Sequence, residues 1–497
     1  MTNRGWLGFL CGKFIACVLC LFSLLSQTSV LASPQSTAGQ LSEARKLVTE
    51  RKYAEAEVLV RALIARQPSA DGLDLLGYIC EQQNKLDQAE AAYGEAVKLN
   101  SASHFSKTRL GIVYGKKGKY AECVAALEKV HSDIWDSPEA LFYLCRGYFE
   151  TGNNVKALET AAVVEQLGEK DPGAALSVGR LLVSKDLYER AVPLLKKTTS
   201  WLPKSSEAYY SLAFALFKMR KYDEMTPYLD QAQVLDPTAP RILLLRALSL
   251  LDSGKTSAAK DYIRKAQALS PDDKFAAYLW SRVLIEEGNY AEAIKRISEL
   301  IAGGFNDPNA HLSLVTALRR NGEFEKAANY ALHVAQIFPD NPSANLRAAV
   351  ELEFLGELQQ AEGYLRKAIT LGTKDPEILK TAKFSLATIS VKESRDAEAV
   401  QLLQDVIRIN PSDVYARVEL ADIHYKSGQY EQALKLLQEA LSFDSQNKRA
   451  HFLMGNVLTK LGKSAEAEQH FGTFQELERV AETPGAGKPK IYTQSIK

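Results

Sequence analysis

Arginine and aromatic side chains recur at regular intervals along this sequence of 497 residues. The guanidinium group of arginine offers a planar fork of donors that fits a carboxylate. Aromatic faces stack on apolar side chains or on sugar rings, and aromatic and arginine residues dominate binding interfaces. The pattern therefore predicts a surface that binds a partner. The residues that we expect to form it are Tyr78, Phe142, Arg146, Arg180, Tyr210, Phe214, Tyr278 and Arg282.

Sequence motifs for catalysis or metal binding do not occur. None of the seven His residues is followed by Glu, so the HExxH metal motif is absent. We interpret His424 as a buried core residue rather than a metal ligand. Residues 253–257, SGKTS, resemble the end of a phosphate-binding loop, but Ser249 stands where that loop requires its first Gly. We therefore predict a protein that is not an enzyme, with no catalytic residues, no metal and no cofactor.

The charge balance argues against nucleic acid as the main partner. The chain has 61 basic and 60 acidic residues, and apolar residues make up 46%, as in an ordinary folded protein. Without residues 1–32, which contain Arg4 and Lys13, 59 basic residues remain against 60 acidic ones. Binding to duplex DNA needs a concentrated basic surface, and this composition does not indicate one.

The first 32 residues have the composition of a secretory signal peptide. A run of 12 apolar residues from Phe14 to Leu25 precedes Val30-Leu31-Ala32, a small-residue site for cleavage before Ser33. The alternative is an uncleaved membrane anchor formed by Trp6 to Leu25. No later stretch reaches the ~18 apolar residues of a membrane span. We expect an exported protein, periplasmic or secreted, with no membrane span in the mature chain.

Three cysteines follow this segment, Cys80, Cys123 and Cys145. An odd number excludes a complete disulfide framework, although one pair could still form a bridge. We expect all three to be small residues of the core.

One small residue repeats at a nearly constant interval along the chain. Its successive spacings are 33 residues, then eight of 34, then 38, and then two of 34. A period of this size indicates a repeat architecture in which stacked units bury a shared core. The aligned residues are Ala56, Ala89, Cys123, Ala157, Ala191, Met225, Ala259, Ala293, Ala327, Ala361, Ala399, Ala433 and Ala467.

The repeat resembles the tetratricopeptide repeat (TPR) family, whose unit has about 34 residues. The second unit carries Leu76-Gly77, Ala89, Tyr93 and Ala96 at the family positions, although the opening Trp is missing throughout. The resemblance covers residues 37–481. It implies an all-α, right-handed TPR superhelix, an α-solenoid, of about 13 helix-turn-helix repeats. It also implies a bacterial protein of the exported type.

Each unit is expected to contain two helices of about 12–14 residues, with a Gly such as Gly118 in the turn between them. Pro193 and Pro227 fall early in a second helix, where we expect a local distortion. Residues 376–379 are an insertion that makes the array irregular and should add a helical turn. Residues 33–36 are expected to be a linker, and residues 482–497 a short flexible tail.

Helical periodicity divides the first helix of each unit into two faces. Unit positions 4, 7, 8 and 11 form the core stripe, and positions 2, 5, 9 and 12 lie on the opposite face. The TPR resemblance implies that this opposite face lines a concave groove, and the predicted binding residues occupy its positions 5 and 9. The same aromatics could instead pack between neighbouring first helices. The Lys/Asn/Arg clamp for a carboxyl terminus does not appear, since Thr108 and Phe142 stand at such positions.

The function that we predict is a non-catalytic protein–protein interaction scaffold. It would bind an extended segment or a helix of a protein partner in the groove. An alternative of a different class is a component of envelope polysaccharide assembly or export, with a glycan in contact with the groove.

Overall fold

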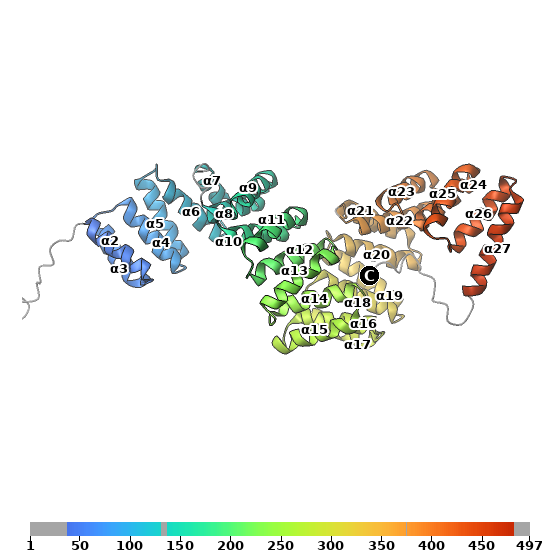
Figure 1. The fold of residues 1–497 in the computed structure, drawn as a ribbon, viewed down its shortest axis with the longest axis horizontal. Coiled ribbons are helices and arrows are strands. Elements are labelled where there is room, and N and C mark those ends of the chain that lie inside the picture. Colours follow the sequence, from blue (N-terminus) through green and yellow to red (C-terminus); the bar gives the residue numbers. More distant parts are fainter. Residues whose placement is uncertain (1–36, 131–136, 374, 482–497) are drawn as a thin grey trace, which may run out of the picture. The chain divides into compact units, whose positions relative to one another are not determined.

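The computed structural model describes residues 37–130, 137–373 and 375–481, and these residues form helices joined by short turns (Figure 1). No strand occurs within these ranges, so the all-α prediction is confirmed. The predicted signal peptide 1–32, the linker 33–36 and the tail 482–497 lie outside the described residues. Within the described part, no helix has the length and apolar character needed to cross a bilayer.

The chain divides into two compact units, which meet in the sequence between Pro237 and Thr238. The N-terminal unit contains six helix pairs. Its helices are α2 (Thr37–Thr49), α3 (Tyr53–Arg66), α4 (Ala70–Gln82), α5 (Leu86–Leu99), α6 (His104–Lys116), α7 (Tyr120–Glu128), α8 (Pro138–Glu150), α9 (Asn154–Leu167), α10 (Pro172–Ser184), α11 (Tyr188–Trp201), α12 (Ser206–Lys218) and α13 (Tyr222–Leu235).

The C-terminal unit contains seven further pairs, so the described residues hold thirteen pairs, as the repeat count predicted. Its helices are α14 (Pro240–Asp252), α15 (Thr256–Leu269), α16 (Lys274–Glu286), α17 (Tyr290–Ala302), α18 (Pro308–Arg320), α19 (Phe324–Ile337), α20 (Pro342–Leu355), α21 (Leu358–Leu371), α22 (Pro376–Lys392), α23 (Asp396–Ile409), α24 (Val414–Lys426), α25 (Tyr430–Phe443), α26 (Lys448–Lys460) and α27 (Ser464–Ala481).

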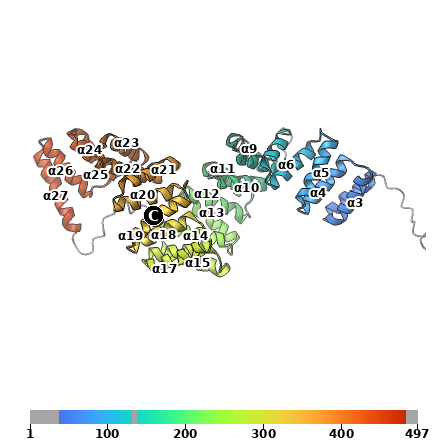
Figure 2. The same ribbon diagram turned by 180° about the vertical axis from the view of Figure 1, so that it is seen from behind.

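Within each unit the helices pack in chain order. Each helix contacts the next one, and first helices also contact each other, as α8 does α10 and α18 does α20. Figure 2 shows the same succession from behind, with α14 to α17 followed by α18 and α19. This nearest-neighbour stacking is the α-solenoid arrangement. The right-handed superhelix remains a prediction.

Close packing of each helix pair depends on small residues. All thirteen aligned small residues are buried, with at most 2% exposure. In the second pair, a Cβ atom on Gly77 would lie 2.7 Å from the ring of Tyr93, which is itself fully buried. The Gly of the Leu-Gly motif therefore makes room for a large side chain of the second helix.

A left-handed residue ends the first helix in every pair. Glycine occupies this turn position in eight pairs, and Gly356, with φ of 85°, is one example. Five pairs place another residue there, also with positive φ, at a steric cost that glycine avoids. These five residues are Arg51, Asn84, Asp186, Arg220 and Ser394.

The helices containing Pro193 and Pro227 are not interrupted. α11 and α13 each run for 14 residues through the proline. Each proline is the sixth residue of its helix, so the hydrogen bond that it removes would have reached a carbonyl of the first turn. The expected distortion therefore does not break either helix.

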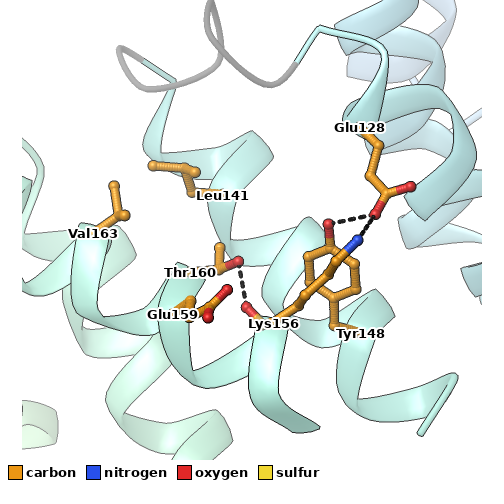
Figure 3. Close-up of a pocket in the computed structure, with 7 residues that line it drawn as sticks. All are labelled: Glu128, Leu141, Tyr148, Lys156, Glu159, Thr160 and Val163. Carbon is orange, nitrogen blue, oxygen red and sulfur yellow. Dashed lines mark hydrogen bonds and ion pairs between the residues drawn. The ribbon is translucent and has the colours of Figure 1, made fainter. Parts of the chain in front are cut away.

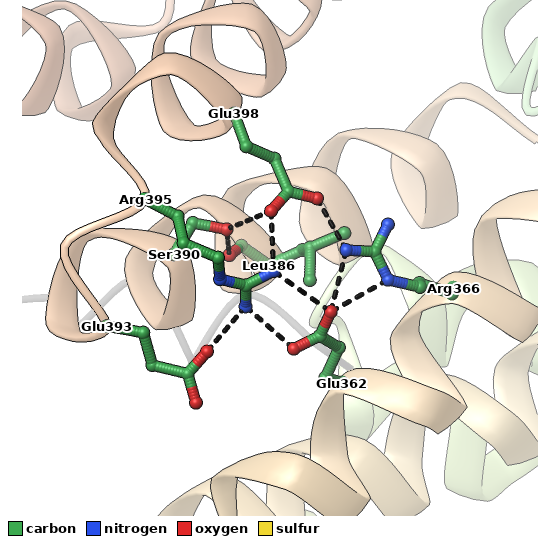
Figure 4. A network of polar contacts seen from close by, with 7 residues as sticks. All are labelled: Glu362, Arg366, Leu386, Ser390, Glu393, Arg395 and Glu398. Carbon is green, nitrogen blue, oxygen red and sulfur yellow. Dashed lines mark hydrogen bonds and ion pairs between the residues drawn. The ribbon is translucent and has the colours of Figure 1, made fainter.

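Two helices depart from the usual length. α7 has 9 residues and ends at Glu128, whereas second helices were expected to have about 12–14. α22 has 17 residues and begins at Pro376, where the four inserted residues lie. A polar network follows α22 (Figure 4). Arg395 contacts Glu362 of α21 at 2.7 Å and Glu398 of α23 at 2.6 Å, and so links three consecutive helices of this irregular repeat.

Candidate functional site

Three first helices of the N-terminal unit, α8, α10 and α12, present the central part of the predicted surface. α8 contacts α10, and α10 contacts α12. Phe142 and Arg146 lie one turn apart on α8, and Tyr210 and Phe214 have the same spacing on α12, so each pair shares one face of its helix. Arg180 holds the equivalent place on α10, between these two pairs.

The side chains on α8 are partly covered. The guanidinium carbon of Arg146 lies 5.4 Å from the ring centroid of Tyr120, which is a cation–π distance. Phe142 is half-buried, and its ring meets that of Tyr143 edge-on at 5.0 Å. Packing therefore holds both side chains in place while part of each stays accessible.

Arg180 is the most accessible of the predicted residues on α10 and α12. Its side chain is 58% exposed, and its Nε atom lies 3.4 Å from Oε1 of Glu207 on α12. An exposed pair at this distance contributes little to stability. The guanidinium group can therefore exchange Glu207 for a carboxylate of a partner at small cost.

Tyr210 and Phe214 form a stacked pair on α12. Their ring centroids lie 6.2 Å apart, and the planes are inclined by 29°. Both side chains are half-buried. A rigid aromatic pair beside an exposed guanidinium is typical of the anchoring part of an interface.

Tyr278 and Arg282, on α16 of the C-terminal unit, are held by packing. Tyr278 is 3% exposed, its ring packs near Phe305 at 5.9 Å, and its hydroxyl lies 3.2 Å from Ser313 Oγ. This corrects the expectation for Tyr278, because a side chain buried to this extent cannot contact a partner. Arg282 is paired with Asp252 at 2.9 Å. For these two residues the structure favours the packing alternative.

Tyr78 lies on α4, apart from the stretch α8 to α12, and is half-buried. Its neighbour Glu81 was expected on the exposed face, at position 12, but its side chain is only 1% exposed. Glu81 accepts hydrogen bonds from Arg109 and, at 2.5 Å, from Lys116. Position 12 therefore faces the adjacent first helix, because neighbouring pairs stack more tightly than the periodicity of one helix can show.

Glu139 completes this charged cluster of the N-terminal unit. Its carboxylate lies 3.0 Å from Arg109 and 3.0 Å from Lys116. Burial alone would raise the pKa of Glu139, but Lys116 and Arg109 outweigh this effect and lower it. The cluster therefore contains two cations and two carboxylates, which satisfy one another.

A cavity of about 520 Å³ opens where α7 ends early (Figure 3). Its polar groups already bond to one another: Tyr148 donates to Glu128 at 2.8 Å, and Lys156 pairs with Glu128 at 2.7 Å. Thr160 donates to the backbone carbonyl of Lys156. Such an arrangement holds no poised acid, base or nucleophile. The sequence signal for the cavity is the irregular end of the third repeat, which we did not use.

The cysteines and histidines also show no reactive arrangement. Cys80, Cys123 and Cys145 are free and buried, which confirms that they are core residues. Burial raises the pKa of Cys123 to about 12 and that of Cys145 to about 12, so their thiols are unreactive. His424 is only half-buried and hydrogen-bonds to Gln429, so its expected burial was wrong.

Family comparisons match much of the chain. A model described as "TPR repeat" matches residues 421–462. One described as "Tetratricopeptide repeat" matches residues 250–318, and a second with the same description matches residues 41–104, 210–274 and 312–377. Together these matches extend over both units.

Individual proteins resemble the chain more distantly. Intraflagellar transport protein 70A of Xenopus tropicalis is 25% identical over 179 residues, which cover 36% of this chain and 27% of that protein. The Cut9–Hcn1 structure of the APC/C is 14% identical over 90% of this chain and 95% of the matched chain, with a TM-score of 0.48. MamA of Desulfovibrio magneticus RS-1 is 21% identical over 36% and 98%, with a TM-score of 0.33.

Proposed function

This chain belongs to the tetratricopeptide repeat family, and from that premise we propose that it is a non-catalytic scaffold for protein partners. Members of this family act as protein–protein interaction scaffolds, and the matches extend over both units. The finer part of the proposal is the place of binding. An extended segment or a helix of the partner would lie across α8, α10 and α12 of the N-terminal unit.

The observation that carries this proposal is the exposed Arg180 between two groups of aromatic side chains. Arg146 and Phe142 lie on one side of it, and the stacked Tyr210 and Phe214 lie on the other. Its Nε atom is only loosely paired with Glu207, at 3.4 Å. Aromatic and arginine anchors on a preformed surface can bind a partner without ordering a loop.

Paired substitutions test the binding surface. Arg180→Ala with Phe214→Ala should reduce recovery of a cross-linked protein partner from an extract of the producing cells by about tenfold or more, because each anchor is expected to contribute at least ~1 kcal/mol. Lys196→Ala, on the exposed face of α11, is the matched control. A photo-cross-linking residue in place of Tyr210 should label the same partner.

Equal recovery by both variants would contradict the placement on α8, α10 and α12. Helicity measured by circular dichroism must be unchanged, because Phe214 is half-buried. Recovery of carbohydrate without protein would instead favour the polysaccharide alternative, which no contact described above supports.

We also propose that the protein is exported, on the composition of residues 1–32. The mass of the protein recovered from its own cells should correspond to a chain that begins at Ser33. A mass that includes residues 1–32 would favour the membrane-anchor alternative.

A further inference from the structure

A second buried carboxylate lies on the inner helices of the C-terminal unit. The side chain of Glu351, on α20, is 1% exposed. Its Oε2 atom accepts a hydrogen bond from Nη1 of Arg319, on α18, at 2.8 Å, and its Oε1 atom lies 3.8 Å from Nη1 of Arg347. Glu351 therefore links α18 to α20 as Glu81 links α4 to α6.

Positive charge is in excess around Glu351. Arg320 follows Arg319 at the end of α18 and is exposed. The pKa of the buried Arg347 is lowered by burial and, in opposition to Glu351, by the nearby charges of Arg319 and Arg320. Three arginines and one glutamate carry a net charge of +2. A further carboxylate here would gain attraction that no like cluster of balanced charge can offer.

Exposed aromatic side chains adjoin these arginines. The guanidinium carbon of Arg319 lies 4.7 Å from the ring centroid of Phe354, and the rings of Phe354 and Phe324 lie 5.0 Å apart. Phe354 is 53% exposed, Phe324 41% and Leu355 44%. Neighbouring exposed apolar side chains of this size are typical of a binding surface.

We propose that Arg319, Arg320, Phe324, Phe354 and Leu355, the α18–α20 patch, bind an acidic segment of a partner protein that also carries an apolar or aromatic side chain. A partner carboxylate lies against the exposed Arg320 and the accessible side of Arg319. The apolar side chain of the partner covers Phe324 and Phe354. This inference rests on the proposed scaffold function and gives it a second surface with a defined partner chemistry.

The chemistry of the patch selects a protein rather than a nucleic acid. Duplex binding depends on many phosphate contacts by basic side chains, whereas the patch offers two accessible arginines. Three exposed apolar side chains beside them match a peptide that alternates acidic and apolar residues. Binding is therefore expected to weaken with salt without disappearing, because the apolar contact is not screened.

A random twelve-residue peptide library displayed on phage, selected on the purified protein, tests the proposal. Enriched peptides should contain Asp or Glu next to an aromatic or aliphatic residue. Synthetic copies should bind at least tenfold more weakly to Arg320→Gln and to Phe354→Ala than to the wild type, as measured by fluorescence anisotropy. Both positions are exposed, so neither change threatens folding. Arg408→Gln, which alters an exposed arginine of α23, is the matched control.

Each outcome of the selection decides between the two surfaces. Peptides without acidic residues, or peptides whose binding is unchanged in Arg320→Gln and Phe354→Ala, would overturn the proposal. Binding lost in Arg180→Ala with Phe214→Ala but kept in the α18–α20 variants would support the first surface and overturn the second. Loss only in the α18–α20 variants would support the second surface while leaving the first to its own cross-linking test.

Discussion

The two units are built from the same helix pair, yet they bury charge in different ways. Glu81 in the N-terminal unit and Glu351 in the C-terminal unit both have side chains that are 1% exposed and accept hydrogen bonds from an adjacent first helix. Around Glu81 the structure places Arg109, Lys116 and the second carboxylate of Glu139. Three arginines surround Glu351 instead.

This difference separates a structural cluster from one that can take part in binding. Around Glu81, the charges are balanced, so the cluster holds α4, α6 and α8 together and attracts nothing further. The excess positive charge around Glu351 costs stability that a partner carboxylate can restore. The same repeat position can therefore serve packing in one unit and recognition in the other.

Removal of the two buried carboxylates should have unequal effects. Glu351→Gln leaves Arg319 and Arg347 without their carboxylate and should lower the free energy of unfolding by about 3–5 kcal/mol. Glu81→Gln should cost less, about 1–3 kcal/mol, because Glu139 still pairs with Arg109 and Lys116. Urea unfolding measures both, and equal losses would contradict the distinction between the clusters.

An apolar replacement of the buried arginine should relieve the larger loss. In the Glu351→Gln background, Arg347→Met removes the most buried unpaired charge and should recover about 1–4 kcal/mol. Arg347 is 7% exposed, so a side chain of similar length can fill its place. A double-mutant cycle gives the coupling free energy, and strictly additive effects would show that the two groups do not interact.

Acid should affect the N-terminal cluster through Glu139. The pKa of this carboxyl is lowered, so its contribution is complete above its ordinary pKa of 4.5 and is lost as the pH falls through the lower folded value. The urea midpoint of the wild type should therefore fall more between pH 5 and pH 3 than that of Glu139→Gln. We expect a modest difference, because Glu139 is 44% exposed. Glu122→Gln, on α7, is the control and should behave as the wild type.

The turns within the pairs also differ between the units, with a smaller expected effect. Four of the five non-glycine residues with positive φ lie in the N-terminal unit, and Ser394 alone lies in the other. Arg220→Gly should stabilise the protein by about 0.5–1 kcal/mol, because glycine adopts this conformation without strain. Asn84→Gly should gain less, since Asn tolerates the left-handed region. A thermal shift of equal size in both variants would argue against this explanation.

The repeat register could be predicted because it depends on local chemistry. One small residue every 34 positions placed the close contact in each helix pair, and all thirteen of these residues are buried. The left-handed turn was visible wherever Gly occupies it, as at Gly118 and Gly356, but not where Arg220 does. Helix starts and turns lie within a few residues of one another, so the sequence contains the information.

The surface of the first helices was harder to predict because it depends on the neighbouring pair. Helical periodicity treats a helix as isolated, and it therefore placed Glu81 and Tyr278 on an exposed face. Adjacent first helices cover both side chains. Arg319, Arg320 and Phe354 were missed for a related reason, since they come from two repeats and only the packing of α18 on α20 brings them together.

The three core cysteines give this protein an internal reporter of motion. Cys80, Cys123 and Cys145 all lie in the N-terminal unit, and residues 238–497 contain no cysteine. A buried thiol can react with an alkylating reagent only when the surrounding helices open transiently. The labelling rate of the unmodified protein therefore measures the breathing of α4 to α8 alone. A partner bound across α8 should slow it, and no engineered probe is needed.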